Sequence, residues 1–296
     1  MSSRPLRLIS TVRVIISTRS SWSPRLLAID VDGTLTRPSR GVDNTLVPLL
    51  SELGERGVAV VVATGRGQFA AAEITKHLSP TAYAVLNNGG VIRCLGDGRI
   101  VRARHLSYGA ATSVLEVYRR EGMVGIWVES PFAGSRYLCD GAWWDHLPTK
   151  RYLSTKAPIV RPLPAPTVAG CPVEVFAFGD RTAVGRAERA IQCTIGSNVS
   201  TVSWWSDRLE AGGLEALPPG VTKGEAVAWL ANELGIDASE SVAVGDDRND
   251  LEMLQWAGHS VAMAHAPADV RAAATQVSEV EGPPAVRQLL GDIWGV

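Results

Sequence analysis

The chain has 296 residues, a formal net charge of −1 and a hydrophobic content of 46%. A net charge so close to zero provides no basic field for binding nucleic acid, and no apolar run is long enough to span a bilayer. The four cysteines lie far apart, so the sequence indicates neither a zinc site nor a disulfide framework, and a reducing cytoplasm fits.

Residues 1–25 differ from the rest in composition, because they are rich in arginine and serine and contain no acidic residue. This bias is typical of a transit peptide. The apolar stretch Val12–Ile16 is interrupted by Arg13 and is too short for a secretory signal. We favour a disordered extension or an early start codon over a transit peptide, and we exclude residues 1–24 from the fold. Removal of residues 1–22 is then expected to change activity and melting temperature little.

The first predicted element is a buried strand at Leu26–Ile29, followed by Asp30, Asp32 and then Gly33. In a parallel sheet, the loops that leave the carboxyl ends of the strands form the ligand crevice. Two carboxylates so close together repel each other, which points to a shared cation or to a division of catalytic roles. An ordinary acidic turn is the alternative for this stretch taken alone.

Two more strands are predicted downstream. Val58–Ala63 is a β-branched run that ends at Thr64-Gly65-Arg66, and Tyr83–Leu86 is a short strand that ends at Asn87–Gly90. Helices are predicted before the first of these strands and, over residues 68–78, between the two. Strands that alternate with helices in this way predict an α/β fold with a doubly wound parallel sheet.

The alternation stops in the middle of the chain. A predicted hairpin, a capped helix, short strands and a proline-rich stretch at residues 158–172 indicate an inserted α+β unit. We therefore expect residues 25–92 and 207–296 to form one catalytic core domain and residues 93–206 to form a cap domain. For Trp143, Trp144, Trp204 and Trp205, which all lie in this insert, we favour packing in a small core or a domain contact over stacking on a substrate.

The alternation resumes near the carboxyl end. Thr222 and Glu225 have the spacing of a capping box and open a helix with Lys223 in its first turn. Ser241–Val244 predicts a strand that ends in the acidic stretch Gly245–Asp250. Carboxylates, an ammonium group and helix N-termini at one sheet edge suit a magnesium ion and a phosphate group. A carboxylate placed there can also attack phosphorus and form an acyl phosphate.

Four motifs in this order resemble those of the haloacid dehalogenase-like (HAD) superfamily, most closely its Cof-type sugar-phosphatase branch. They are Asp30-Val31-Asp32-Gly33-Thr34, Ala63-Thr64-Gly65-Arg66, Lys223 and Gly245-Asp246-Asp247-Arg248-Asn249-Asp250. The resemblance implies a HAD-like Rossmannoid core with an α/β cap inserted after Asn88. One departure is Met263-Ala264-His265-Ala266, where many Cof-type chains have Met-Gly-Asn-Ala. We favour a surface position for His265 over one in the crevice.

The resemblance also implies roles for the motif residues. Asp30 would be the nucleophile, Asp32 the general acid and later the general base, and Lys223 the bridge between nucleophile and phosphate. The residues that it implies for substrate binding are Thr64, Gly65, Arg66, Asn88 and Lys223. Those that it implies for a Mg²⁺ site are Asp30, Asp32 through its backbone carbonyl, Asp246 as a direct ligand, and Asn249 and Asp250 to position the ion or its waters. A solvated role for Asp247 remains equally open.

The function that the resemblance implies is a Mg²⁺-dependent phosphatase of small phosphomonoesters, acting through an aspartyl-phosphate. Sugar phosphates and phosphorylated cofactors or their precursors are the expected partners, with no nucleic acid or membrane involved. A phosphomutase, which returns the phosphoryl group to its substrate, is the near alternative. A non-catalytic binding protein is the alternative from another class, although such a protein is expected to lack Asp30, Asp32 or Lys223. Dehalogenase chemistry is disfavoured, because that branch needs neither the second aspartate nor a metal.

Overall fold

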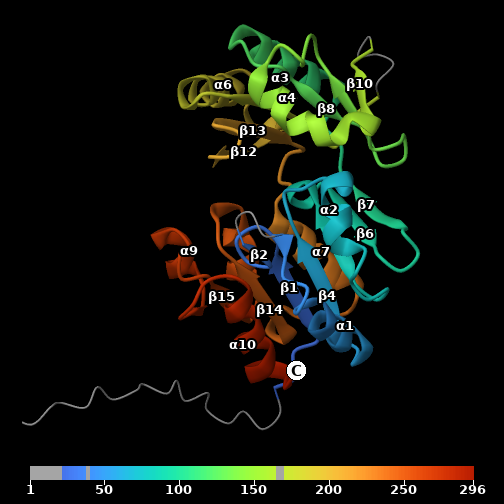
Figure 1. Cartoon of the computed structure of the whole chain (residues 1–296), viewed down its shortest axis with the longest axis vertical. Helices are drawn as coiled ribbons and strands as arrows, with labels where there is room; N and C mark the ends of the chain where they lie inside the picture. The colour runs from blue at the N-terminus through green and yellow to red at the C-terminus, as the bar shows by residue number, and fades with distance from the viewer. Residues whose placement is uncertain (1–21, 38–40, 165–169) are drawn as a thin grey trace, which may run out of the picture.

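The computed structural model describes residues 22–37, 41–164 and 170–296, which form two lobes joined by two crossings of the chain (Figure 1). The larger lobe is built on an eight-stranded sheet and the smaller one on a six-stranded sheet. The two termini of the described chain lie on the larger lobe. None of the helices in the described segments is long and apolar enough to cross a membrane.

The eight-stranded sheet has the order β16-β15-β14-β1-β4-β5-β6-β7. Its central strand β1 (Leu26–Asp30) pairs in parallel with β4 (Ala59–Ala63) and β14 (Ser241–Gly245). Further out are β5 (Tyr83–Leu86), β15 (His259–Ala262) and β16 (Gln276–Val277), all parallel, and the antiparallel strands β6 (Val91–Cys94) and β7 (Ile100–Ala103). This arrangement confirms the predicted α/β fold with a mainly parallel sheet.

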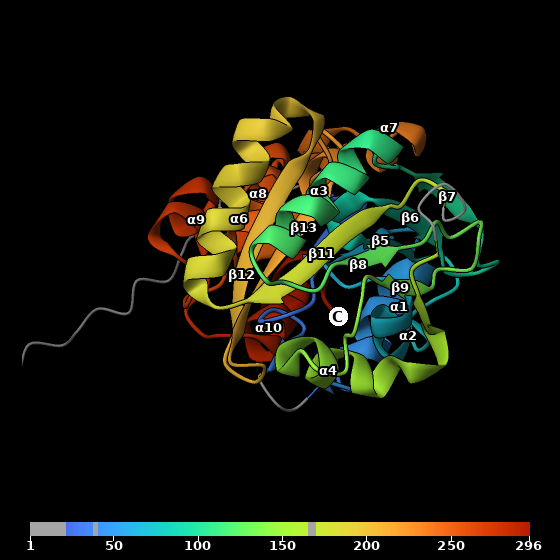
Figure 2. The same cartoon turned by 90° about the horizontal axis from the view of Figure 1, so that it is seen from above.

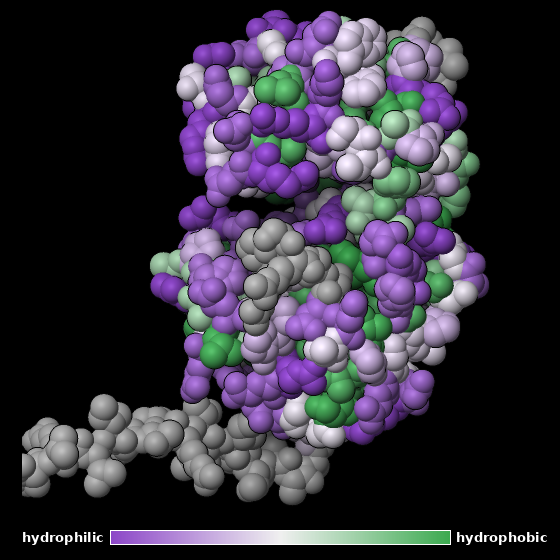
Figure 3. All heavy atoms as spheres, viewed as in Figure 1, coloured by the Kyte–Doolittle hydropathy of each residue, from purple (hydrophilic) through white to green (hydrophobic). Residues whose placement is uncertain are grey.

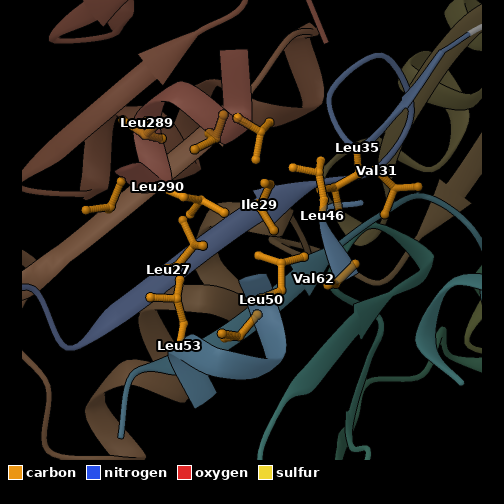
Figure 4. Close-up of a cluster of buried hydrophobic side chains, with 14 of the residues drawn as sticks. Leu27, Ile29, Val31, Leu35, Leu46, Leu50, Leu53, Val62, Leu289 and Leu290 are labelled. Atoms are coloured by element: carbon orange, nitrogen blue, oxygen red, sulfur yellow. The ribbon is translucent and has the colours of Figure 1, made fainter. Parts of the chain in front are cut away.

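Helices cover both faces of this sheet, so its strands are buried on both sides. On one face, Leu27 and Ile29 of β1 pack between Leu50 of α1 and Leu290 of α10 (Figure 4). The other face is covered by α7, α8 and α9. The helices of this lobe are α1 (Val47–Glu55), α2 (Gln68–Thr75), α7 (Lys223–Glu233), α8 (Leu251–Trp256), α9 (Ala268–Ala273) and α10 (Pro283–Trp294). It also contains the short 3₁₀ turns η1 (Asn87–Gly89), η4 (Ala238–Glu240) and η5 (Arg248–Asp250). A small hairpin is formed by β2 (Thr36–Arg37) and β3 (Gly41–Val42).

The six-stranded sheet has the order β10-β9-β8-β11-β13-β12. Its strands are β8 (Ile126–Val128), β9 (Tyr137–Cys139), β10 (Val160–Pro162), β11 (Glu174–Gly179), β12 (Ser200–Ser206) and β13 (Ala211–Leu217). The outer face is covered by α3 (Tyr108–Arg120) and α6 (Arg181–Thr194), which lie side by side across the strands in Figure 2. The inner face is turned toward the larger lobe and carries α4 (Leu147–Leu153) and η2 (Ser154–Ile159), while η3 (Gly196–Asn198) follows α6.

Both boundaries between the lobes differ from those that the sequence predicted. The hairpin β6–β7 was assigned to the insert after residue 92, but it extends the eight-stranded sheet to residue 103. Strand β13 was assigned to the core from residue 207 onward, but it pairs with β11 and β12 in the six-stranded sheet as far as Leu217. We therefore propose domain boundaries near residues 104 and 218.

The amino end also requires a correction. Residues 1–21 lie outside the described residues, but Trp22, which was assigned to the extension, packs on the core. Its indole N–H donates to the carbonyl of Ser239 at 2.9 Å, and its ring meets His259 edge-on. The indole N–H of Trp294 donates to the carbonyl of Pro24 at 3.1 Å. The packed core therefore includes Trp22, and removal of residue 22 removes packing.

Trp22→Ala is expected to lower the free energy of unfolding by about 1–3 kcal/mol, because it removes a partly buried aromatic ring and a hydrogen bond. Urea unfolding followed by circular dichroism measures this loss. Trp144→Ala is the matched control, since that side chain is 54% exposed, and its effect is expected to stay within about 0.5 kcal/mol. Equal stability of wild type and Trp22→Ala would contradict the docking of this segment.

Candidate active site

Two of the three predicted catalytic residues, Asp30 at the end of β1 and Lys223 at the start of α7, are in direct contact. The ammonium of Lys223 is 1% exposed and donates to Asp30 Oδ1 at 2.5 Å and to Asp250 Oδ1 at 2.8 Å. Burial alone would lower the pKa of Lys223, but the carboxylates of Asp250 and Asp30 outweigh it and raise that pKa above its ordinary value. Lys223 is therefore a fixed positive charge beside Asp30.

The second oxygen of Asp30, Oδ2, is buried and has no hydrogen-bond partner among the described residues. Burial raises the pKa of Asp30 well above its ordinary value, against the lowering effect of Lys223. A buried acceptor without a partner is costly. A bound cation would satisfy this oxygen and favour the ionised carboxylate. Asp30 Oδ2 is therefore a candidate ligand atom for a cation.

Three carboxylates can share a cation here. Asp30, Asp246 and Asp250 each offer an oxygen, and these oxygens lie within 4.8 Å of one another. A set of oxygen donors without histidine or cysteine suits Mg²⁺ better than zinc or copper. The residues present thus fit the magnesium ion that the sequence predicted.

Within this set, Asp250 anchors the loop. Its Oδ2 accepts the backbone N–H groups of Asp246 at 3.0 Å and Asp247 at 3.1 Å, and its Oδ1 accepts from Lys223. Asp246 is the freer carboxylate, with one contact to Thr34 Oγ1 at 3.2 Å and one to a histidine described below. Asp247 is exposed and caps η5 by accepting from the amide of Arg248, which is the solvated role that the sequence left open.

Gly33 explains why the first motif needs glycine. Its φ is +91°, in the left-handed region, and a Cβ built on it would overlap the Asp246 carboxylate. Any side chain at position 33 would therefore push Asp246 away from Asp30.

Asp32 occupies a different place from the other acidic residues. Its side chain is 56% exposed and forms a bidentate ion pair with Arg66, at 2.8 Å from Nε to Oδ2 and 2.5 Å from Nη2 to Oδ1. Its carboxylate is not part of the group that Asp30 forms with Asp246 and Asp250.

The predicted phosphate-binding loop follows β4. Thr64 is fully buried and its Oγ1 accepts the backbone N–H of Arg66 at 3.1 Å. A Cβ on Gly65 would come within 3.1 Å of the Asn88 side-chain nitrogen, so glycine keeps the loop close to Asn88. The loop thus lies between Asn88, which Gly65 approaches, and Asp32, which Arg66 binds.

Asn88 joins the two lobes. It lies in η1 with φ near +50°, and its Nδ2 donates to Glu215 Oε2 of β13 at 2.6 Å. Its Oδ1 accepts from Asn249 Nδ2 at 2.9 Å, so Asn249 contacts Asn88 rather than the carboxylate cluster. Asn87 makes the parallel contact, donating to Glu174 Oε2 of β11 at 2.6 Å.

Sequence reasoning missed Glu174 and Glu215. Both are buried on the inner face of the six-stranded sheet, and burial raises the pKa of Glu215 to about 7 and that of Glu174 well above its ordinary value. The available signal was an acidic residue at an inward position of an apolar strand, which is rare without a role. Trp204 donates to Glu215 Oε1 at 2.7 Å and packs, partly buried, against the inner-face cluster. Trp144 and Trp205 are instead exposed.

His265 lies closer to the site than expected. His265 is exposed, as predicted from the sequence, but its Nε2 lies 3.0 Å from Asp246 Oδ2. The preference for a surface position away from the crevice was therefore wrong. The altered loop at residues 263–266 places an imidazole against the carboxylate that is best placed to bind a cation.

Comparisons with known proteins agree with this geometry. The family model described as haloacid dehalogenase-like hydrolase matches residues 27–288. An HMP-PP phosphatase of Cronobacter sakazakii is 29% identical over 246 residues, covering 82% of this chain and 85% of that protein. A phosphoglycolate phosphatase of Methanoculleus marisnigri is 28% identical over 264 residues, covering 86% and 90%. The crystal structure of a haloacid dehalogenase-like hydrolase from Bacteroides thetaiotaomicron superposes with a TM-score of 0.78 at 20% identity, covering 92% and 100%, which shows a shared fold.

Proposed function

This chain belongs to the haloacid dehalogenase-like hydrolases, and from that membership we propose that it is a Mg²⁺-dependent phosphatase of small phosphomonoesters that works through a phosphoryl group on Asp30. The assignment as a phosphoric monoester hydrolase agrees with the relatives to which the chain is similar, which are named as phosphatases. The observation that carries the mechanism is Asp30 itself. One of its oxygens is held by Lys223, and the other is buried and has no hydrogen-bond partner in the part of the chain that the structure describes.

In the proposed first step, a carboxylate oxygen of Asp30 attacks phosphorus while the bond from phosphorus to the ester oxygen breaks. The leaving oxygen takes a proton from Asp32. Lys223, with Thr64 and the Gly65 amide, holds the oxygens of the transferring group. Mg²⁺ bound by Asp30 and Asp246 would neutralise charge on the phosphate and orient it.

In the second step, water attacks the same phosphorus and gives a proton to Asp32, and the bond from phosphorus to Asp30 breaks. Inorganic phosphate leaves and the starting carboxylate is restored. Asp32 thus acts first as acid and then as base, and its proton balance closes over one cycle.

Arg66 sets a condition on this cycle. Both oxygens of Asp32 accept from Arg66 in this structure, whereas an acid must carry a proton on one of them. A substrate phosphate offers Arg66 another anionic partner. We propose that substrate binding draws Arg66 away and releases Asp32 toward the leaving oxygen.

Chelation of divalent ions is expected to abolish phosphate release, and added Mg²⁺ should restore it. Asp246→Ala is expected to raise the Mg²⁺ concentration for half-maximal activity by about 10- to 100-fold. The test is a colorimetric phosphate assay on a panel of phosphate esters over a Mg²⁺ series, with the remote, exposed Asp97→Ala as the control. Full activity after exhaustive chelation would contradict the metal assignment.

The phosphomutase alternative has a direct test. The enzyme is incubated with a sugar monophosphate and a bisphosphate activator, and the sugar isomer and inorganic phosphate are both quantified. Phosphate as the main product supports hydrolysis, and isomer as the main product supports a mutase.

All four cysteines are free, which agrees with the reducing cytoplasmic location that we propose.

A further inference from the structure

The cap carries a buried cation that the proposed mechanism does not use. Lys156 lies in η2, is only 8% exposed, and donates to the carbonyl of Tyr152 at 3.0 Å. Its Nζ also lies 3.8 Å from the centre of the Tyr152 ring. Among the described residues, no carboxylate forms an ion pair with it within 4.0 Å. A buried ammonium without an anionic partner is costly to keep.

The position of Tyr152 places this ammonium on the inner face of the cap. The Tyr152 ring packs on Phe176 and Phe178 of β11 at centroid distances of 5.5 and 5.0 Å, and on Tyr137 of β9 at 6.3 Å. This inner face is turned toward the larger lobe. Figure 3 shows the cleft between the two lobes, with hydrophilic side chains along both of its edges.

Two other cations act on Lys156. Burial, and then repulsion by Arg208 and Arg66, lowers the pKa of Lys156 to about 8. The hydroxyl of Tyr137 lies beside Gly67, since a Cβ built on Gly67 would come within 3.2 Å of it. The inner face that carries Tyr152 and Lys156 therefore approaches the loop whose Arg66 holds Asp32. Arg208 is exposed in the turn between β12 and β13. Positive side chains of both lobes are therefore close enough to repel one another, and the proposed mechanism places the leaving oxygen beside Asp32, the partner of Arg66.

We propose that Lys156 and Arg208 form a subsite for a second anionic group, a carboxylate or a further phosphate, on the leaving group of the substrate. The proposal rests on the proposed phosphatase function and narrows its substrate class. The anion would give Lys156 the partner that the protein itself does not supply. It would also fix the leaving oxygen next to Asp32, because the two ends of the substrate are held from opposite lobes.

Two pairs of esters test the subsite and separate the two anions. Phosphoglycolate is compared with ethyl phosphate, in which a methyl group replaces the carboxylate, and propane-1,3-diol bisphosphate is compared with its monophosphate. In the wild type, kcat/KM is expected to be at least about tenfold higher for the second-anion member of one pair. Lys156→Met should remove most of that preference by raising KM for the second-anion ester, and kcat/KM for the other ester of the pair should stay within about twofold of wild type. Lys156→Arg should retain the preference.

The control is Lys150→Met, an exposed lysine of α4 in the same cap segment. Binding provides a second readout without turnover: in Asp30→Asn, calorimetry should show that Lys156→Met weakens binding of the preferred second-anion ester but not that of its partner. The subsite is refuted if the wild type shows no preference in either pair, or if Lys156→Met lowers the rate equally for both members of a pair. Neither result contradicts the proposed phosphatase function. Failure to hydrolyse any ester, including nitrophenyl phosphate, overturns the proposed function instead.

Discussion

Asp30→Asn is expected to abolish phosphate release, with a loss of more than about 10⁴-fold, while the protein stays folded. An amide cannot form the acyl phosphate on which the proposed mechanism depends. The fold should tolerate the change, because the remaining carbonyl oxygen can accept from Lys223 as Asp30 Oδ1 does. Lys223 also retains its contact with Asp250, so no buried charge is left without a partner.

The measurement is steady-state phosphate release with a nitrophenyl ester and with an alkyl ester, together with thermal unfolding by circular dichroism. Asp292→Asn in α10 is the matched control, because it makes the same chemical change at an exposed site of the same lobe. Turnover close to wild type in Asp30→Asn would refute the nucleophile. An unfolded variant would show that the carboxylate is needed for folding, and Asp30→Glu would then be examined for a trapped phosphoryl group.

Asp32→Ala is expected to reduce the rate by about 10²- to 10⁴-fold for an alkyl phosphate, which needs a proton on its leaving oxygen. A nitrophenyl leaving group departs without that proton, so phosphorylation of Asp30 should suffer much less with the aryl ester. The later attack by water still lacks its base. Phosphoenzyme should therefore accumulate in Asp32→Ala with the aryl ester but not with the alkyl ester.

Acid quench on the millisecond to second timescale would trap the phosphoenzyme, and parallel assays would give the rates for both esters. Arg66→Lys serves as a comparison, because it keeps the positive charge but loses the bidentate geometry with Asp32. If both esters lose rate equally at the phosphorylation step, Asp32 serves the metal or the structure, and its assignment as general acid is wrong.

The sequence predicted the parts of the fold that local pattern determines. Apolar runs such as Leu26–Ile29 and Val58–Ala63 became central parallel strands, and their polar ends met at one edge. The hairpin at β6–β7 and strand β13 were assigned to the wrong lobe. The pattern of the hairpin identifies its strands but does not specify their partner, because pairing depends on contacts with residues far away in the chain. Residues 211–217 were not recognised as a strand at all.

The same limit applies to the site. Asp30, Lys223 and Asp250 were predicted together because each follows a recognisable strand or helix end, and they meet in the structure. The bond of Asn88 to Glu215 crosses between lobes, and no local pattern encodes it. The contact of His265 with Asp246 arises from a loop that departs from the resembled motif, so the motif gave no guide to it.

The topology has a consequence for how the chain folds as it is synthesised. Strand β1 is flanked by β4 and by β14, and β14 follows the entire cap in the sequence. The six-stranded sheet is complete once Leu217 has emerged, whereas one edge of β1 stays open until Ser241–Gly245 arrive. Open apolar edges template aggregation, and such distant pairings form slowly. The cap is thus expected to fold first on the ribosome, and completion of the core that carries Asp30 is expected to be the later step.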